Sequence, residues 1–170
     1  LAGFPGLSKL VMFYDSNDIQ LSSKTEVVTK EDTAKKYEAW GWKVISINGN
    51  DTEQIMDALK AADNETEKPT LIIGKTIMGK GAVTDSDESF ESQTSTHGMP
   101  LSNAGASFEK TISNLGGDPA NPFTIFPEVA AFYEEVKEKK RAAVVVKKQE
   151  QKEWEKSNPE RGHGNQGIGW

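Results

Sequence analysis

Apolar residues gather in three short runs in the first half of the chain. The runs cover residues 10–14, 42–47 and 71–73, and polar or glycine-containing segments separate them. A short run of this kind, bounded by turn residues, is typical of a strand buried in a parallel sheet. We therefore predict three strands, the first of which ends at the polar sequence Asp-Ser-Asn.

Two segments between these runs have the spacing and the terminal residues of helices. Residues 29–40 begin with Thr29, which can cap a helix, and are followed by Gly41, which can stop one. The segment before the third run places its apolar residues on one helical face, and it begins with Asn50 and Glu53, which fit a capping pair. We predict a helix in each place.

This alternation of strand and helix predicts an α/β fold with a doubly wound, mostly parallel sheet and helices on both faces. Ligands of such folds bind outside the carboxyl ends of the strands. Residues 15–21 follow the first predicted strand and residues 74–81 follow the third. Both segments therefore belong to the expected ligand-binding edge.

The second half of the chain is more polar. Residues 84–96 form a Ser/Thr-rich acidic loop that is too long for a simple connector. Residues 104–115 are predicted as one helix that ends at two glycines. A long charged helix is predicted over residues 128–157, with an interruption at three consecutive valines, residues 144–146.

Charge and cysteine content exclude several classes of function. The net charge is -6, with a pI near 5.1, which argues against nucleic acid or an anionic membrane as a partner. The chain has no cysteine, so disulfides, thiolate metal sites and a cysteine nucleophile are excluded. No apolar stretch is long enough to span a bilayer. These properties are compatible with a cytoplasmic protein.

Asn17 and Ile19 follow the first predicted strand and are the first candidates for chemistry. Such a loop can offer one Asn carboxamide oxygen and, two residues on, one backbone carbonyl oxygen. These are hard ligands of the kind that Mg²⁺ takes when it also holds phosphates. The alternative is an ordinary turn, because Asp and Asn residues favour turns for backbone reasons alone.

Two further candidates lie beyond the third predicted strand. His97, at the end of the acidic loop, could donate a hydrogen bond to a phosphate or a substrate oxygen, or it could be a solvated loop histidine. The sequence Gly79-Lys80-Gly81 could cradle a phosphate. It is not a P-loop, because the Lys-Ser/Thr ending and the following helix are absent.

The candidates lie in sequence blocks that follow one another in the order seen in transketolases. The blocks are residues 1–3, 6–17, 31–42, 69–73, 75–81 and 97–101. Residues 114–123 also resemble the stretch that follows this domain in one bacterial-type branch, so that the resemblance extends over residues 1–158. The chain thus resembles most of the domain that binds the pyrophosphate of thiamine diphosphate in transketolases.

The resemblance implies a role for each candidate. Asn17 would give its side-chain oxygen, and Ile19 its backbone carbonyl, to a Mg²⁺ ion that Ca²⁺ can replace. Leu21 and Met78 would provide apolar contacts to the cofactor. His97 would contact the diphosphate and lie close to the substrate, as a catalytic residue.

The family motif begins with a Gly-Asp-Gly that would lie upstream of residue 1. Because position 1 is Leu rather than Met, we expect a cut end there and a fold that is incomplete at its N-terminus. By the same resemblance residues 1–123 are the C-terminal part of the cofactor domain, residues 124–160 a helical extension, and residues 161–170 a glycine-rich tail or linker.

The family reaction transfers a two-carbon ketol unit from a ketose phosphate to an aldose phosphate in the pentose phosphate pathway. The expected partners are sugar phosphates, the remaining transketolase domains and a second subunit of a homodimer, so the chain alone is expected to be inactive. Two alternatives stay open at this point. The chain could belong to another thiamine-diphosphate enzyme, of the dihydroxyacetone synthase or deoxyxylulose-phosphate synthase type, or it could be a non-catalytic split subunit.

Overall fold

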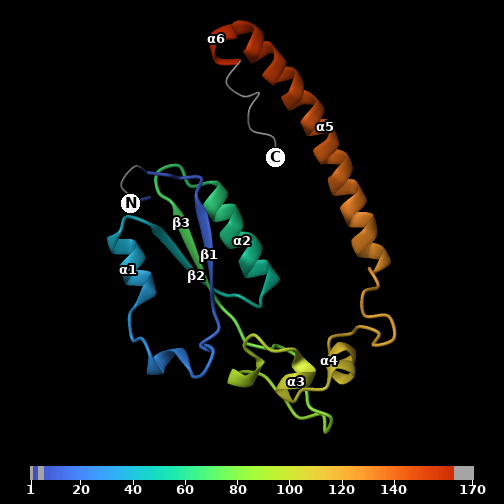
Figure 1. Ribbon diagram of the computed structural model, residues 1–170. Coiled ribbons are helices and arrows are strands. Elements are labelled where there is room, and N and C mark those ends of the chain that lie inside the picture. Colours follow the sequence, from blue (N-terminus) through green and yellow to red (C-terminus); the bar gives the residue numbers. More distant parts are fainter. Residues whose placement is uncertain (1, 4–5, 163–170) are drawn as a thin grey trace. The chain divides into compact units, whose positions relative to one another are not determined.

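The computed structural model describes residues 2–3 and 6–162 (Figure 1). The chain divides into two compact units, Leu1–Pro122 and Phe123–Trp170. Residues 163–170, which make up most of the predicted tail, lie outside the described residues.

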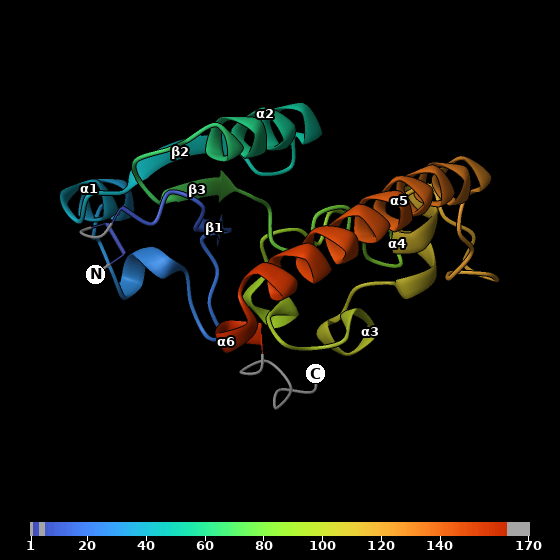
Figure 2. The same cartoon turned by 90° about the horizontal axis from the view of Figure 1, so that it is seen from above.

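The first unit is built on a sheet of three parallel strands. They are β1 (Val11–Ser16), β2 (Lys43–Asn48) and β3 (Thr70–Lys75), and they pair in the order β1-β3-β2. β3 therefore lies in the centre, and Figure 2 shows it between its two partners. The predicted α/β fold with a parallel sheet is confirmed.

Two helices connect these strands. α1 (Thr33–Ala39) leads from β1 to β2, and α2 (Thr52–Asp63) leads from β2 back to β3. The two connections cross the sheet in opposite directions, and right-handed crossovers then place their helices on opposite faces. Figure 1 shows α1 and α2 on either side of the strands.

The core of the unit lies on β3. Leu71 and Ile72 are fully buried there, because β3 is paired on both edges and covered on its faces. Ala58 and Ala62 of α2 are also buried, and their small side chains allow the helix to lie close to the sheet. The apolar run at residues 71–73 therefore became the central strand, and the amphipathic helix α2 covers it.

α1 begins later than the sequence indicated. The Asp32 side chain accepts a hydrogen bond from the backbone N–H of Lys35 at 3.0 Å, so Asp32 is the N-cap. Thr29, the predicted cap, instead accepts from the N–H of Glu31 in a local turn. The helix starts at the Asp because its carboxylate can reach an N–H of the first turn.

The predicted cap of α2 was also wrong by one residue. Asp51 is the N-cap, and its side chain accepts from the N–H groups of Glu53 and Gln54 at 3.0 and 3.1 Å. Asn50 does not cap the helix. Its side-chain oxygen accepts a hydrogen bond from the N–H of Ile77, 27 residues further along the chain, at 3.0 Å.

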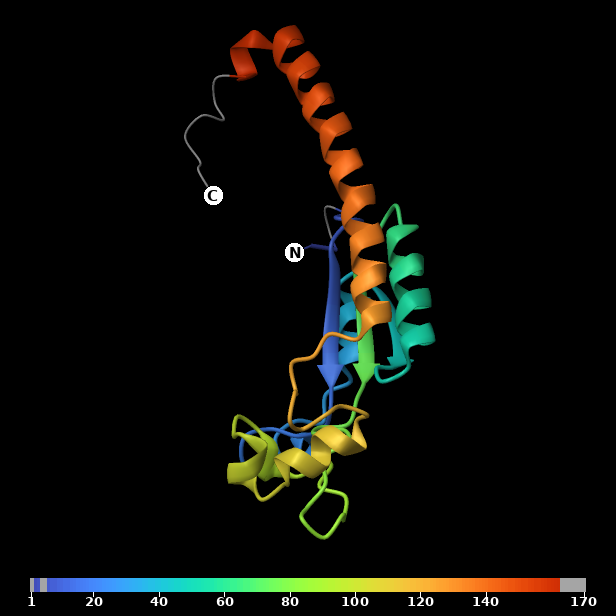
Figure 3. The same ribbon diagram turned by 90° about the vertical axis from the view of Figure 1, so that its right-hand side faces the viewer.

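The helix predicted over residues 104–115 begins later, as α4 (Phe108–Asn114). A separate short helix, α3 (Leu101–Ala104), precedes it and ends at Gly105, whose φ of 109° ends a helical turn. In Figure 3 the arrowheads of β1 and β3 point toward the yellow-green part of the chain that carries these short helices. Two 3₁₀ turns complete the unit, at Thr25–Val27 and Thr94–Thr96.

The described part of the second unit, up to residue 162, contains one long helix and a final short one. α5 (Pro127–Ser157) runs without interruption, so the break predicted at the three valines is wrong, and α6 (Pro159–Gly162) follows. None of the residues of α5 is buried. None of the helices in the described part of the chain is sufficiently long and apolar to cross a membrane.

Glu65 stabilises the connection between α2 and β3. Its carboxylate accepts hydrogen bonds from the N–H groups of Glu67 at 2.9 Å and Lys68 at 3.3 Å, and it forms an ion pair with Lys43 at 3.1 Å. The backbone N–H of Glu67, followed by the Lys43 ammonium, lowers the pKa of Glu65 to about 2. Because the pKa in the folded state lies below the ordinary value of 4.5, the charged form is favoured by folding.

We expect the stabilisation by Glu65 to be complete above a pH of about 4.5 and to disappear as the pH falls toward about 2. Wild type should therefore melt at a higher temperature than Glu65→Gln at pH 7, and the gap should narrow below pH 4.5. Glu67→Gln is the matched control, because the Glu67 side chain forms no ion pair with any described residue. Thermal melts of the three proteins at several pH values test this, and a gap that does not depend on pH would contradict it.

Candidate functional site

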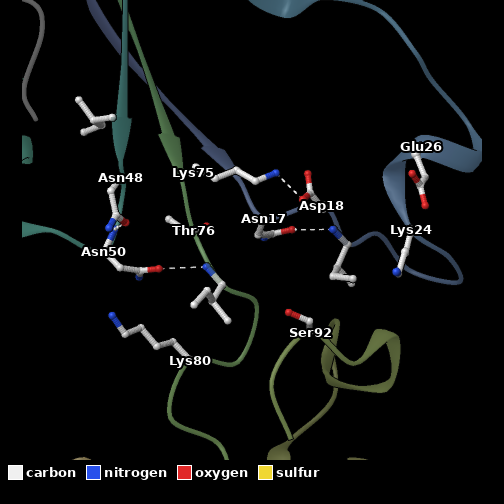
Figure 4. A pocket seen from close by; sticks show the side chains of 13 residues that line it. Asn17, Asp18, Lys24, Glu26, Asn48, Asn50, Lys75, Thr76, Lys80 and Ser92 are labelled. Atoms are coloured by element: carbon white, nitrogen blue, oxygen red, sulfur yellow. Dashed lines mark hydrogen bonds and ion pairs between the residues drawn. The ribbon is translucent and has the colours of Figure 1, made fainter. Parts of the chain in front are cut away.

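A cavity of about 740 Å³ lies at the carboxyl ends of all three strands. Residues that follow β1, β2 and β3 line it, and Ser92 of the acidic loop closes one side (Figure 4). These three segments are distant in sequence. The parallel pairing of the strands in the order β1-β3-β2 brings them together at one edge of the sheet. The cavity is at the edge where ligands bind in folds of this class.

A tight turn at the end of β1 presents Asn17 and Ile19 to the cavity. The Asn17 side-chain oxygen accepts a hydrogen bond from the N–H of Ile19 at 3.0 Å. Asp18 between them has a φ of 63°, in the left-handed region that Asp and Asn tolerate better than most residues. The side-chain oxygen of Asn17 is thereby held in one orientation and keeps a second lone pair.

The chain then folds back on itself and fixes this turn. The N–H of Thr25 donates to the carbonyl of Asp18 at 2.8 Å, and the N–H of Gln20 donates to the carbonyl of Ser23 at 3.0 Å. Ile19 is 7% exposed. Of the described residues, none donates a hydrogen bond to the Ile19 carbonyl oxygen, so this oxygen is available as a ligand.

The segment that leaves β3 is held from both neighbouring strands. The N–H of Thr76 donates to Ser16 at the end of β1, and the N–H of Gly49 donates to the carbonyl of Lys75 at 2.7 Å. Asn50 binds the N–H of Ile77, as described above. Sequence reasoning missed Asn50 as a residue of this site, although its position directly after β2 is a sign of it.

The charges around the cavity favour an anionic ligand. Three lysines, Lys24, Lys75 and Lys80, line it together with two carboxylates, Asp18 and Glu26. Lys75 forms an ion pair with Asp18. Neither Lys24 nor Lys80 has an ion-pair partner among the residues that the structure describes.

The predicted site residues fall into two groups. Asn17 and Ile19 line the cavity, whereas Leu21, Met78 and His97 do not. Leu21 lies two residues beyond Ile19 and is 75% exposed. Met78 is connected to the cavity through its carbonyl oxygen, which accepts a hydrogen bond from the N–H of Ser92 at 2.8 Å.

His97 is partly buried at the end of the second 3₁₀ turn. Its backbone N–H donates to the carbonyl of Thr94 at 3.1 Å. The Nδ1 atom of its ring is buried and has no hydrogen-bond partner in the described part of the chain. A buried polar atom without a partner calls for an explanation, and a ligand oxygen at that position would supply the missing hydrogen bond.

The backbone of Gly79-Lys80-Gly81 does not form a phosphate cradle. The N–H of Lys80 donates to Ile77, the N–H of Gly81 to the Glu91 side chain, and the N–H of Ala82 to Gly79. These donors are therefore already used within the protein. The Lys80 side chain, by contrast, lines the cavity.

The oxygen donors present fit a hard cation that is shared with a ligand. Within the residues that the structure describes, no three His, Asp or Glu side chains form a metal cluster. The Asn17 carboxamide and the Ile19 carbonyl are suited to Mg²⁺, which keeps several water or phosphate ligands and needs few from the protein. The residues at the end of β1 thus fit a Mg²⁺–diphosphate group.

Comparison with known proteins identifies the family. The family model described as Transketolase, thiamine diphosphate binding domain, matches residues 1–167. A transketolase of Treponema pallidum (strain Nichols) is 40% identical over 136 residues, which are 80% of this chain and 19% of that protein. The chain therefore spans about a fifth of the length of that relative.

Solved structures of transketolases share the fold. The crystal structure of transketolase from Campylobacter jejuni superposes with a TM-score of 0.80 at 31% identity and covers 94% of this chain and 24% of that one. A Pichia stipitis transketolase, crystallised in complex with sedoheptulose 7-phosphate, superposes with a TM-score of 0.81 at 27% identity over 95% of this chain and 23% of that one. The chain belongs to the transketolase family, as part of its thiamine diphosphate binding domain.

Proposed function

We propose that the complete protein is a transketolase that depends on thiamine diphosphate and Mg²⁺. It transfers a two-carbon ketol unit from a ketose phosphate to an aldose phosphate, a step of the pentose phosphate pathway. The observation that supports this most directly is the cavity at the strand ends, which the ordered oxygen of Asn17 and the open carbonyl of Ile19 line beside Lys24.

The residues of this chain hold and orient the cofactor in this proposal. Asn17 and Ile19 bind the Mg²⁺, and the ring nitrogen of His97 donates to the diphosphate close to the substrate. Leu21 and Met78 contact the cofactor with their apolar side chains. When bound, thiamine diphosphate supplies the carbanion stabilisation that the transfer of a ketol unit requires.

The chain supplies only one part of the active site. Its match covers about a fifth of the transketolase from Treponema pallidum, so the other domains carry further groups. We propose that the site is completed by those domains and by a second copy of the protein in a homodimer, and that this segment alone is inactive.

The sugar phosphate bound to the Pichia stipitis enzyme supports sugar phosphates as substrates. The absence of cysteine is compatible with the proposed cytoplasmic location.

Calorimetric titration of the complete gene product with thiamine diphosphate tests the proposal. We expect saturable binding in the presence of Mg²⁺ and a large loss of affinity when EDTA removes the metal, because the diphosphate binds through the ion. Adding Ca²⁺ should restore binding. Equal affinity with and without a divalent cation would contradict the assignment of Asn17 and Ile19 as metal ligands.

A further inference from the structure

The β2 side of the cavity offers hydrogen-bond donors. Asn48 and Asn50 line it at the end of β2, and Lys80 lines it from the segment beyond β3. In Figure 4 these three side chains lie on the side of the cavity opposite to Lys24 and Glu26, and the Lys80 side chain extends toward Asn50. Nothing in the proposed cofactor site uses these three residues.

The orientation of both amides is fixed by the backbone. The side-chain oxygen of Asn48 accepts from the N–H of Asn50, and the side-chain oxygen of Asn50 accepts from the N–H of Ile77, each at 3.0 Å. An amide nitrogen cannot take the place of either oxygen, because two donors would then face each other. The NH₂ group of each amide is therefore free to donate hydrogen bonds to a ligand, since neither donates to any of the described residues.

Lys80 adds a positive charge to these amides. The left-handed glycines on either side of it, with φ values of 64° and 80°, set the direction of the chain at this point. Within the described ranges, no carboxylate pairs with its ammonium group. Asp51, the carboxylate next to Asn50, is already held by the N–H groups of α2 that it caps and by the Gln54 side chain.

We propose that this side of the cavity is a second anion site, in which Lys80, Asn48 and Asn50 bind a phosphate group. An ammonium and two NH₂ groups can donate to several oxygens of one phosphate, and hydrogen bonds to an ionised acceptor are the strong ones. The ligand is a phosphate monoester or inorganic phosphate. The assignment of a phosphorylated sugar as its source rests on the proposed function, whereas binding of inorganic phosphate does not.

Lys80→Met in the complete gene product, loaded with thiamine diphosphate and Mg²⁺, tests the site. We expect the dissociation constant for inorganic phosphate, measured by ³¹P NMR titration, to rise about tenfold, because one charged hydrogen-bond donor is lost. Lys60→Met is the matched control, since it removes the same charge from an exposed position of α2, and its dissociation constant should equal that of wild type. The affinity for thiamine diphosphate should stay unchanged in both variants.

Asn50→Asp gives an independent check. The aspartate keeps an oxygen for the N–H of Ile77, so the segment beyond β3 stays in place, but the NH₂ donor is replaced by a negative charge. We expect this variant to bind inorganic phosphate at least as weakly as Lys80→Met. Its melting temperature shows whether the fold is retained.

Steady-state kinetics separate the two sources of the phosphate group. With ribose 5-phosphate as acceptor, Lys80→Met should raise the KM about tenfold if the site holds the substrate, while ribose without the phosphate should show no change. An unchanged KM for both sugars, together with weaker binding of inorganic phosphate, assigns the site to free phosphate. Equal phosphate affinity in wild type and Lys80→Met, or no phosphate binding by wild type, would overturn the proposal, and neither result affects the cofactor site.

Discussion

Replacing Asn17 with alanine in the complete protein should weaken the Mg²⁺-dependent binding of thiamine diphosphate by at least about tenfold. Even the loss of a residue that only hydrogen-bonds to a metal ligand lowers metal affinity or activity about 10–100-fold. The substitution removes an oxygen that faces the cavity at the end of β1. It also removes the acceptor for the N–H of Ile19 and so frees the turn that presents the Ile19 carbonyl. Calorimetry with thiamine diphosphate at fixed Mg²⁺ measures the change.

Gln20→Ala is the matched control for this experiment. It also truncates an amide in the same loop, and among the described residues the Gln20 side chain forms a hydrogen bond only with Ser23. We expect its cofactor affinity to equal that of wild type. If Asn17→Ala and Gln20→Ala bind the cofactor equally well, Asn17 is only a turn residue and the metal assignment fails.

The second large effect is expected at Gly49, where the loop after β2 crosses the end of β3. A Cβ at this position would lie 2.9 Å from backbone atoms of Gly74 and 2.6 Å from the Cγ2 methyl of Thr76. Backbone atoms of a central strand cannot move aside cheaply, so Gly49→Ala should destabilise the fold by about 2 kcal/mol, as overpacking does. The melting temperature of the complete protein should fall by several degrees.

A double mutant shows whether this steric contact is the cause. Thr76→Ser removes the methyl group and keeps the hydroxyl that donates to Asp15. Gly49→Ala combined with Thr76→Ser should therefore recover part of the lost stability, and the remaining loss reflects the contact with Gly74. A melting temperature of Gly49→Ala equal to that of wild type would show that the loop accommodates a side chain.

The sheet could be predicted from the sequence because its signals are local. Residues 71–73 are the most apolar run of the three, and they became the buried centre of β3. The turn at Asn17 could also be predicted, since Asp and Asn directly after a strand favour this geometry. The resemblance of the sequence blocks to transketolases then leads to the prediction that the Asn17 side-chain oxygen and the Ile19 carbonyl of that turn bind a metal ion.

The rest of the site depends on contacts between distant segments. Asn50 was assigned to a helix cap, because nothing in its neighbourhood shows that Ile77 needs an acceptor. The phosphate cradle that Gly79-Lys80-Gly81 could form from its sequence is not available, because the Glu91 side chain accepts a hydrogen bond from one of the N–H groups that it needs. The local sequence shows which hydrogen-bond donors and acceptors a segment has. Which of them already have a partner within the protein depends on the contacts of the folded chain.

The lack of buried residues in α5 determines how this helix responds to substitution. Its order comes from propensity and from neighbouring pairs such as Lys139 with Glu135, each of which contributes only a few tenths of a kcal/mol. These contributions are nearly independent of one another. Replacing one surface residue by another of similar helix propensity should therefore change the helix–coil equilibrium only slightly. Mutational tolerance within this segment taken by itself is therefore uneven: α5 accepts wide changes of sequence, whereas Gly49 and its neighbours accept few.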